Sequence, residues 1–362
     1  MKITTIIGAR PQFIKAGTVS RELLKFPDVQ ENIIHTGQHY DENMSDIFFE
    51  EMEIPKPAFH LGVGGTSQGD MTGRMIQEIE KILVQRRPDY VMLYGDTNST
   101  MAGAIAASKL HIKIIHIESG LRSFNMKMPE EVNRIITDRL SYMLFCPTDS
   151  AIANLKAEGV ENWCNNFMQS GDVMQDGAFF YREKSKKPEI PISDGGFILT
   201  TIHRAENTDE RSKLEDLLRG INEIAANNEV VFPIHPRTKS RIDEFSIDVS
   251  ENITFIDPVG YLNSVWLLSN CKAVLTDSGG MQKEAFFFEK PCITLREETE
   301  WVELLEEGVN ILVGSSSEKL RKAFDNINDI EKRKFDQSIY GNGLASQVIV
   351  SKILSDYHND TS

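Results

Sequence analysis

The sequence lacks any apolar run long enough to cross a membrane, and Met1-Lys2 leads directly into a short apolar stretch. No membrane span or leader peptide is therefore expected, and a cytoplasmic location is the prediction. Its four cysteines show no CxxC spacing, which argues against a disulfide framework and a zinc site. A DxD motif and clustered His/Asp ligands are also lacking, so we expect neither a metal nor another cofactor.

The chain also lacks an excess of basic residues. Its 39 lysines and arginines are outnumbered by 54 acidic residues, giving a formal net charge of −15. A nucleic-acid surface needs clustered basic side chains, so a nucleic-acid partner is not expected. A free nucleotide remains possible, because helix amino termini and a few arginines can supply local positive potential.

At 362 residues the chain exceeds what one hydrophobic core usually supports, so two domains are expected. Apolar strand patterns alternate with helical patterns, which predicts parallel sheets with right-handed crossovers. We expect an α/β protein of two Rossmann-like, doubly wound domains facing a central cleft. The expected division is residues 1–171, residues 172–344, and a terminal helix at 345–358 that returns to the first domain. One expected helix falls near residues 42–51.

Four apolar strands run directly into loops that carry charged, imidazole or glycine residues. The carboxyl ends of parallel strands, beside the amino ends of the following helices, are where such sheets bind ligands. Two of these loops lie in each half, which suggests one ligand held between two similar domains. The four loops follow strands at residues 3–7, 90–93, 198–201 and 273–276.

The loop after residues 273–276 has the features of a phosphate site. Gly279 and Gly280 allow a close backbone approach, while Ser278 precedes a helix whose first N–H groups point toward an anion. Glu284, one turn into that helix, could accept two ribose hydroxyls. A simple turn with a helix cap is the alternative, but the whole pattern favours nucleotide binding.

Two cations follow the first strand. Arg10 stands at the corner between strand and helix, and Lys15 lies one turn along that helix. Pro11 suits a first helical turn, where its missing N–H costs nothing. Solvation of Lys15 and a capping salt bridge for Arg10 are the alternatives; contact with an anion is the interpretation we favour.

Carboxylates gather at the strand ends of the first half. Asp96 and Glu118 each end a strand, and Glu130 and Glu131 follow Pro129. Carboxylates brought together in a cleft shift each other's pKa, which suits abstraction and return of a proton. Taken singly, Asp96 could cap a helix, Glu118 could pair with Arg122, and Glu130 and Glu131 could lie in a solvated first helical turn. Their convergence favours acid–base chemistry.

Histidines follow two strands of the second half. His203-Arg204 and His235 could both face the cleft, whereas His35 or His116 is expected in the core. His203 is the one we favour as a base, an acid or a donor to phosphate.

With these residues assembled, the chain resembles the non-hydrolysing UDP-N-acetylglucosamine 2-epimerases, which share the GT-B fold of many glycosyltransferases. The matching motifs run through nearly the whole chain in the family's order. They are GARP at 8–11 with Lys15, QH at 38–39, YGDTNST at 94–100, ESGLR at 118–122, PEEVNR at 129–134, HR at 203–204, TDSGGMQKE at 276–284 and ETE at 298–300.

The resemblance implies inversion at C2 of a UDP-linked 2-acetamido sugar, for surface polysaccharide synthesis. UDP is eliminated to give a glycal and adds back after protonation on the opposite face. The roles that the resemblance implies are acid–base catalysis by Asp96, Glu118 and Glu130, diphosphate assistance by His203, phosphate binding by Arg10, Ser278 and Gly279, and ribose binding by Glu284.

Three departures point to one branch of the family. Members acting on UDP-N-acetylglucosamine usually have Glu where this chain has Gln12, and Arg where it has Trp301. The segment after Gln38-His39 is one residue longer than usual. These variants look more like the branch that epimerises UDP-2,3-diacetamido-2,3-dideoxy-glucuronic acid.

In some bacterial members a second substrate molecule binds allosterically, through residues that match Gln38, His39, Arg74 and His235 here. The longer segment after His39 puts that regulation in doubt. The family also implies a homodimer.

Other functions stay open at this point. A retaining GT-B glycosyltransferase would use a similar nucleotide helix, but it needs no acidic set, so Asp96, Glu118 and Glu130 count against it. A hydrolysing epimerase would release UDP and free sugar. A non-catalytic nucleotide-sugar sensor would leave the acidic residues without a role.

Overall fold

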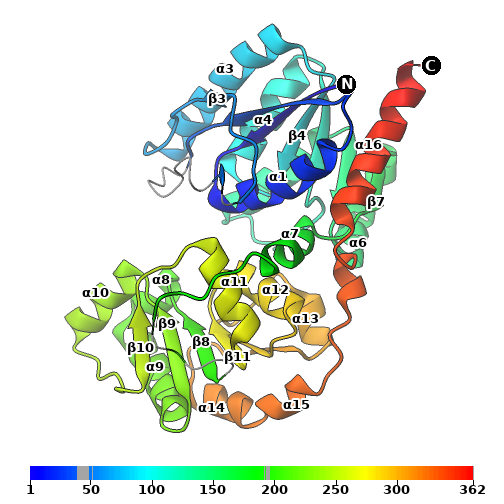
Figure 1. The fold of residues 1–362 in the computed structure, drawn as a ribbon. Coiled ribbons are helices and arrows are strands. Elements are labelled where there is room, and N and C mark those ends of the chain that lie inside the picture. The colour runs from blue at the N-terminus through cyan, green and yellow to red at the C-terminus, as the bar shows by residue number, and fades with distance from the viewer. Residues whose placement is uncertain (39–48, 51, 191, 193–195, 362) are drawn as a thin grey trace. The chain divides into compact units, whose positions relative to one another are not determined.

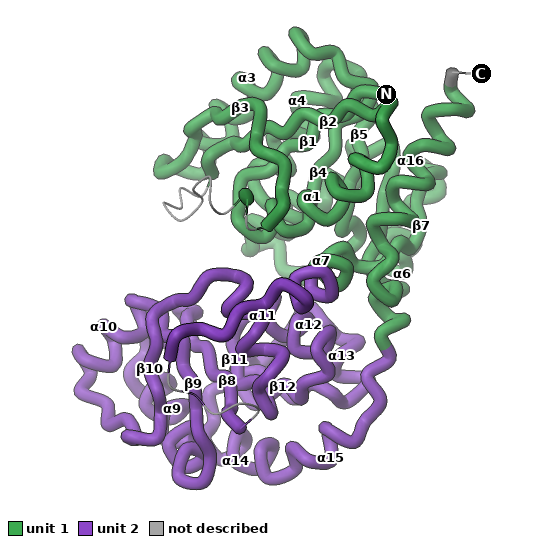
Figure 2. Tube along the Cα trace, in the orientation of Figure 1, with its two compact units in different colours: residues 1–177, 337–362 green, residues 178–336 purple. Residues whose placement is uncertain are grey.

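The computed structural model describes residues 1–38, 49–50, 52–190, 192 and 196–361 (Figure 1). The chain forms two compact units, residues 1–177 with 337–362, and residues 178–336 (Figure 2). The sequence divisions were placed after residues 171 and 344. The segment before the last helix belongs to unit 1 because Asp172 N–H donates to the Tyr340 carbonyl at 2.8 Å and Gly343 N–H to Gln175 Oε1 at 2.9 Å.

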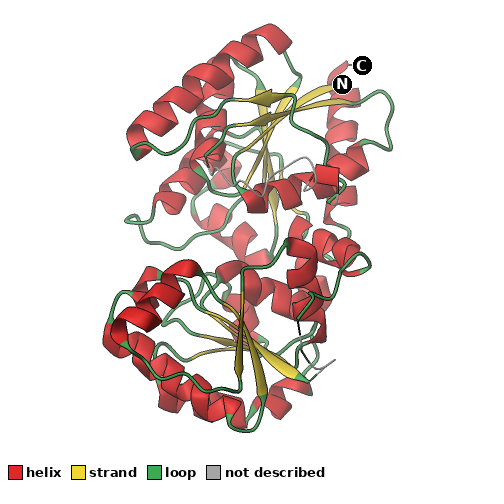
Figure 3. Cartoon of the chain, turned by 60° about the vertical axis from the view of Figure 1, so that its left-hand side comes forward, coloured by secondary structure: helices red, strands yellow, loops and turns green. Residues whose placement is uncertain are grey.

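Unit 1 contains, among its described residues, a seven-stranded sheet in the order β3-β2-β1-β4-β5-β6-β7, and every pairing is parallel. Helices cover both faces of the sheet (Figure 3). The elements are β1 Lys2–Ile7, α1 Arg10–Leu23, β2 Gln30–His35, β3 Phe59–His60, α3 Gln68–Arg86, β4 Tyr90–Tyr94, α4 Asn98–Lys109, β5 Lys113–Ile117, α5 Pro129–Leu140, β6 Met143–Cys146, α6 Asp149–Ala157, the 3-10 turn Val160–Asn162, β7 Phe167–Gln169, the 3-10 turn Gln337–Tyr340 and α16 Ala345–Thr361. Helix α7, Val173–Arg182, begins in unit 1 and ends in unit 2.

Burial explains why these segments are strands and helices. The central strands β1 and β4 are covered on both faces: all their residues except Lys2 are buried, and most of them are apolar. α4 packs close to them because its residues are small: a Cβ on Gly103 would lie 2.7 Å from Leu93 Cδ2. The helix expected near residues 42–51 falls mostly outside the described residues.

Unit 2 contains, in its described part, a six-stranded sheet in the order β10-β9-β8-β11-β12-β13, again with parallel pairings. The predicted doubly wound α/β class is thereby confirmed for both units. The elements are β8 Phe197–Thr201, α8 Ala205–Thr208, α9 Arg211–Ala225, β9 Glu229–Pro233, α10 Pro236–Phe245, β10 Ile253–Ile256, α11 Tyr261–Asn270, β11 Ala273–Thr276, α12 Gly279–Phe287, β12 Cys292–Thr294, α13 Val302–Glu306, β13 Asn310–Leu312, α14 Ser317–Asp325 and α15 Ile327–Glu331.

The strand order fixes where each unit can bind a ligand. In unit 1 the order reverses between β1 and β4, and in unit 2 between β8 and β11. The loops that leave adjacent strands at a reversal diverge to opposite faces and leave a crevice at the carboxyl edge. The four loops singled out from the sequence are the four that leave these strands.

Candidate functional site

A cavity of about 330 Å³ lies at the β1/β4 reversal in unit 1. It brings together side chains from the β1 loop, the β4 loop and the start of α5. Its lining comprises Ala9, Pro11, Gln12, Lys15, Gln38, Gln68, Tyr94, Gly95, Asp96, Thr97, Asn98, Pro129, Glu130 and Asn133. Three of the expected site residues, Lys15, Asp96 and Glu130, therefore share one cavity.

Glu118 pairs with Lys15 beside this cavity. Lys15 Nζ lies 2.5 Å from Glu118 Oε2, and the two side chains are only 12% and 9% exposed. Glu118 has a φ of +67°, an unusual backbone for a residue with a side chain. The alternative pairing of Glu118 with Arg122 is wrong, because Arg122 contacts Asp138 and Glu158 instead.

Asp96 is held by a residue that the sequence reasoning had not assigned. Arg134 of α5 lies 2.5 Å from Asp96 Oδ2 and 2.9 Å from Glu131 Oε2. The Asp96 side chain keeps 29% exposure, so it is oriented and still accessible. The N-cap of α4, the helix that follows Asp96, is Thr97, whose Oγ1 accepts from Thr100 N–H. The alternative of Asp96 as a helix cap is therefore wrong.

Glu130 and Glu131 are neighbours with different environments. Glu130 is exposed and lines the cavity, whereas Glu131 is buried. Burial raises the pKa of Glu131, but N–H groups of Ser123 and Phe124 and the Arg134 guanidinium outweigh it, so the pKa is below its usual value. Glu131 therefore holds the 123–124 backbone, and Glu130 is the residue available to a ligand.

The remaining expected residues of unit 1 occupy different places. Arg10 begins α1, next to the lining residues Ala9 and Pro11. Gln38 lines the cavity, where its Oε1 accepts from Ser99 N–H at 3.0 Å and Ser99 Oγ at 2.7 Å. Arg74 lies half exposed on α3, 3.7 Å from Asp70 Oδ2. His39 lies outside the described residues.

The corresponding reversal in unit 2 carries a His–Asp pair. His203 Nδ1 lies 3.0 Å from Asp277 Oδ1, and the His203 side chain is 45% exposed while Asp277 is fully buried. Asp277 also accepts from the N–H groups of His203 and Arg204 and from Asn207 Nδ2. Burial raises the pKa of Asp277, but these donors and the His203 ring outweigh it and lower the pKa.

A carboxylate so placed fixes the orientation of the imidazole. The bond at Nδ1 leaves Nε2 of His203 as the ring nitrogen available to a ligand. A second cavity, of about 210 Å³, lies next to it and is lined partly by His203, His235 and Ser278. The motif at 276–284 was recognised in the sequence, but Asp277 was given no role. Its position at the end of a strand, directly before Ser278, could have indicated that it orients the neighbouring loop.

Ser278 caps α12, with its Oγ accepting from Met281 N–H at 3.4 Å. This is the helix cap given above as the alternative to a phosphate site, and phosphate binding here stays a prediction. A Cβ on Gly280 would meet no heavy atom within 4 Å, so the helix start is open at that point. Glu284, one turn further, is nearly buried and accepts from Tyr261 OH at 3.0 Å.

Arg204 and His235 follow strands of unit 2, as predicted. Arg204 is the N-cap position of α8 and lies 3.9 Å from Glu206 Oε1. His235 is the N-cap of α10, where its Nδ1 accepts from Arg237 N–H at 3.2 Å.

Searches for metal and membrane features gave negative results. Within the described ranges, no three His, Cys, Asp or Glu side chains are grouped so that they could hold a metal ion. Across the same part of the chain, no helix combines the length and apolarity that a membrane span requires. All four cysteines are free thiols and buried.

Two doubly wound units with polar loops at both reversals define a protein of the GT-B class. A glycosyltransferase bound to dTDP shares this fold at a TM-score of 0.52 with 13% identity, over 96% of this chain and 94% of that one. The chain matches the UDP-N-acetylglucosamine 2-epimerase family model over residues 21–354. It therefore belongs to that family.

Among its relatives, the UDP-2,3-diacetamido-2,3-dideoxy-D-glucuronate 2-epimerase of Pseudomonas aeruginosa is 52% identical, over 96% of this chain and 98% of the relative. The UDP-N-acetylglucosamine 2-epimerase of Methanocaldococcus jannaschii is 42% identical, over 97% and 98% of the two chains. A crystal structure of the M. jannaschii enzyme with UDP-GlcNAc and UDP superposes with a TM-score of 0.85 at 42% identity, over 98% of this chain and 99% of that one.

Proposed function

We propose that this chain inverts C2 of a UDP-linked 2-acetamido sugar by eliminating UDP and adding it back. The observation that carries the proposal is the shared cavity of unit 1. This cavity is lined by both Asp96 and Glu130, and the Lys15–Glu118 ion pair lies beside it. The chain's membership of the epimerase family gives these carboxylates an acid–base role. Inversion requires proton removal on one face of the sugar and delivery on the other, which needs more than one carboxyl group.

The elimination step places different demands on the two units. A carboxylate of unit 1 takes the C2 proton, the C1–O bond breaks, and UDP departs with the bonding electrons. Charge that develops on the diphosphate needs preorganised donors. In unit 2 these are His203, oriented by Asp277, and the amino end of α12 at Ser278. Addition reverses these steps after a proton reaches the opposite face of C2.

For the substrate we propose the 2,3-diacetamido-glucuronate sugar. The support is the 52% identity to an epimerase of that name, against 42% for the relative named for UDP-N-acetylglucosamine. Gln12 is not the contact that selects this sugar, since its amide is fully engaged with the protein. Its Oε1 accepts from Gly8 and Ala9, and its Nε2 donates to Tyr94 O and Thr100 Oγ1.

The test follows the sugar H2 signal by NMR in D₂O, with each of the two UDP-sugars. We expect deuterium at C2 and two UDP-sugar epimers, without net release of UDP. Stoichiometric UDP with free sugar would instead establish a hydrolase, and transfer to an added acceptor a glycosyltransferase.

The matched variants are Asp96→Asn and Asp149→Asn. The first removes the carboxylate in the cavity and should lower the exchange rate by about 10²- to 10⁴-fold, while UDP affinity stays within about threefold. The second changes an exposed aspartate in the first turn of α6 and should leave exchange unchanged. Unchanged exchange in Asp96→Asn would remove Asp96 from the mechanism.

A homodimer, which the family resemblance implies, and a cytoplasmic location, expected because the sequence lacks a long apolar run, both remain predictions. Light scattering on the purified protein tests the first, and fractionation of the source cells tests the second.

A further inference from the structure

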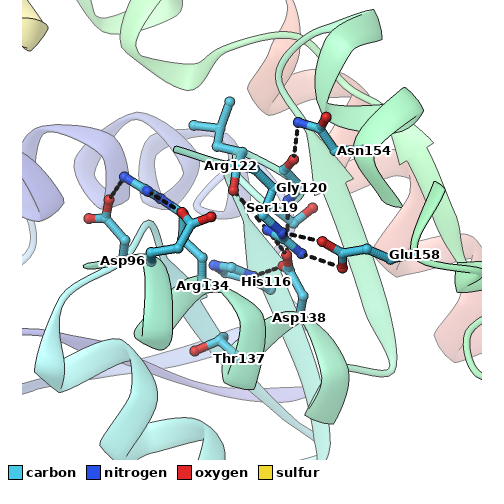
Figure 4. Close-up of polar contacts among 12 residues, drawn as sticks. Asp96, His116, Ser119, Gly120, Arg122, Arg134, Thr137, Asp138, Asn154 and Glu158 are labelled. Atoms are coloured by element: carbon cyan, nitrogen blue, oxygen red, sulfur yellow. Dashed lines mark hydrogen bonds and ion pairs between the residues drawn. The ribbon is translucent and has the colours of Figure 1, made fainter. Parts of the chain in front are cut away.

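A network of charged side chains, buried except for Glu158, adjoins the turns that carry Asp96 and Glu118 in unit 1. His116 of β5 contacts Asp138 of α5, with His116 Nδ1 2.7 Å from Asp138 Oδ1. Asp138 Oδ2 lies 2.7 Å from Arg122 Nη1, and Arg122 in turn binds Glu158 at 2.6 and 2.9 Å. Figure 4 shows these contacts among His116, Asp138, Arg122 and Glu158. The side chains of His116 and Asp138 are 0% and 1% exposed. None of these side chains has a role in the reaction described above.

Both ring nitrogens of His116 face acceptors. Its Nε2 lies 2.8 Å from the Gly95 carbonyl oxygen, which can only accept. On the other side, Asp138 Oδ2 accepts from Gly120 N–H at 3.2 Å as well as from Arg122. Burial raises the pKa of Asp138, but His116 and Arg122 outweigh it and lower the pKa, so the carboxylate is ionised and accepts. Each His116 nitrogen must then carry a hydrogen.

The charges around the ring fit this state. Arg122 and an imidazolium face Asp138 in the core and Glu158, whose side chain is 38% exposed, so two cations meet two anions. The Cys146 thiol on β6 also lies beside the network; burial raises its pKa to about 12, so it adds no charge at neutral pH.

The network holds the two turns that carry the carboxylates. Gly95 has a φ of +62° and immediately precedes Asp96. Gly120 has a φ of +78° and follows Glu118 by two residues; a Cβ there would lie 2.5 Å from the Ala151 carbonyl. His116 binds the first turn directly and the second through Asp138. An uncharged ring that lacked the Nε2 hydrogen would direct a lone pair at the Gly95 oxygen and repel it.

We infer that His116 is a positioning residue in the core that donates from both ring nitrogens, as an imidazolium, and so fixes the loops bearing Asp96 and Glu118. Its protonation rests on the hydrogen-bond geometry alone. Its effect on the reaction rests on the proposed function, because it acts through those two carboxylates.

The protonation state can be read directly from ¹⁵N spectra of the histidine rings in the wild-type protein. The His116 ring, assigned through its own backbone resonances, should show two N–H-type nitrogens across pH 6 to pH 8, a window spanning the ordinary histidine pKa of about 6.5. One N–H-type and one bare nitrogen at neutral pH would overturn the inference. In Asp138→Asn the imidazolium signature should be lost, because the anion that balances the ring is gone.

The positioning role is tested with His116→Gln, whose amide can donate to only one side of the network at a time. We expect the kcat for C2 exchange to fall about 10- to 100-fold while KM stays within about threefold, since small displacements of reacting groups cost rate and not binding. A folded variant with wild-type kcat would overturn the positioning role. Should the variant fail to fold, the spectrum of the wild-type ring still decides the protonation.

His35→Gln is the matched control, a half-buried histidine of β2 in the same sheet whose ring lies 4.9 Å from that of Phe13. Its exchange rate should stay within about threefold of wild type, as expected for a packing change away from the reacting groups. If the wild-type protein shows no C2 exchange, the proposed function fails, and the ¹⁵N spectrum still tests the imidazolium independently.

Discussion

At the scale of single residues, what a side chain does depends more on the groups it contacts than on its residue type. Glu130 and Glu131 are adjacent in the chain, yet one lines a cavity and the other binds backbone N–H groups. In the same way Asp277 holds a loop in place, while its partner His203 keeps much of its surface exposed. In each pair, the exposed residue can reach a ligand, and the buried residue holds the surrounding backbone in place.

Asp277→Asn tests this division. Asparagine keeps only one acceptor oxygen and has no charge, so its NH2 group must face some of the donors that the carboxylate now accepts from, and the loop should be held less firmly. We expect a loss of about 2 to 3 kcal/mol in the free energy of unfolding at pH 7, as for hydrogen bonds to a buried charge. The kcat for exchange should fall with it. Urea unfolding followed by circular dichroism measures the first quantity.

The loss should depend on pH in a defined direction. The native pKa of Asp277 lies below the unfolded value of about 3.9, so its contribution is present above that value and disappears as pH falls toward the native pKa. The difference between wild type and variant should therefore shrink below about pH 4. Asp209→Asn removes an exposed partner of Arg237 and should leave the free energy of unfolding nearly unchanged. If the difference in the free energy of unfolding between wild type and Asp277→Asn were the same at pH 7 and below pH 4, the stabilising role of the ionised Asp277 would be contradicted.

At the scale of elements, α1 is tied to β4 by one buried amide. Gln12 accepts from Gly8 N–H at 2.8 Å and Ala9 N–H at 3.1 Å, and it donates to Tyr94 O at 2.7 Å and Thr100 Oγ1 at 3.0 Å. The four bonds close the gap between the β1 loop and the β4 loop. Gln12, which replaces the glutamate usual in UDP-N-acetylglucosamine epimerases, therefore holds together the two loops that line the cavity.

Gln12→Ala removes all four bonds and leaves the buried Gly8 and Ala9 N–H groups without this acceptor. We expect a loss of about 3 kcal/mol in the free energy of unfolding, measured with urea. Gln12→Glu keeps the two acceptor contacts but turns a buried carboxylate oxygen toward the Tyr94 carbonyl, so it should lower the free energy of unfolding as well. Equal stability of the alanine variant and the wild type would show that the amide is not the link.

At the scale of the whole molecule, the end of the chain completes the first unit. Asp176 of α7 accepts from Ala345 N–H at 3.0 Å, Ser346 N–H at 2.7 Å and Ser346 Oγ at 2.6 Å, so it caps the start of α16. Further along, Asp356 accepts from the hydroxyl of Tyr90 at 2.9 Å. A helix from the far end of the sequence is thereby joined to a central strand of unit 1.

Asp176→Ala should release the start of α16. The expected cost is about 2 kcal/mol, as for the loss of a helix cap. Hydrogen exchange followed by mass spectrometry should show faster exchange over residues 345–361 and no change over residues 178–336. Asp329→Ala, an exposed aspartate in unit 2, is the control and should leave α16 unchanged. Uniformly faster exchange in both units would contradict a local cap.

Prediction from sequence succeeded where a local pattern carries the information. Apolar strands that end in glycine and charged residues identified all four loops at the two reversals, and Pro11 stands in the first turn of α1 as expected. Arg134 and Asp277 received no role because neither has a distinctive spacing. Their importance depends on which distant carboxylate or imidazole they meet.

By itself the sequence determined the alternating α/β class, the placement of the ligand loops and the family, because these follow from hydrophobic periodicity and local motifs. Tertiary structure alone decided which glutamate of the 130–131 pair lines the cavity, that Lys15 and not Arg122 neutralises Glu118, and that His116 faces two acceptors. Ion pairs and buried hydrogen bonds join residues distant in the chain, and their geometry exists only once the sheet has brought the strand ends together.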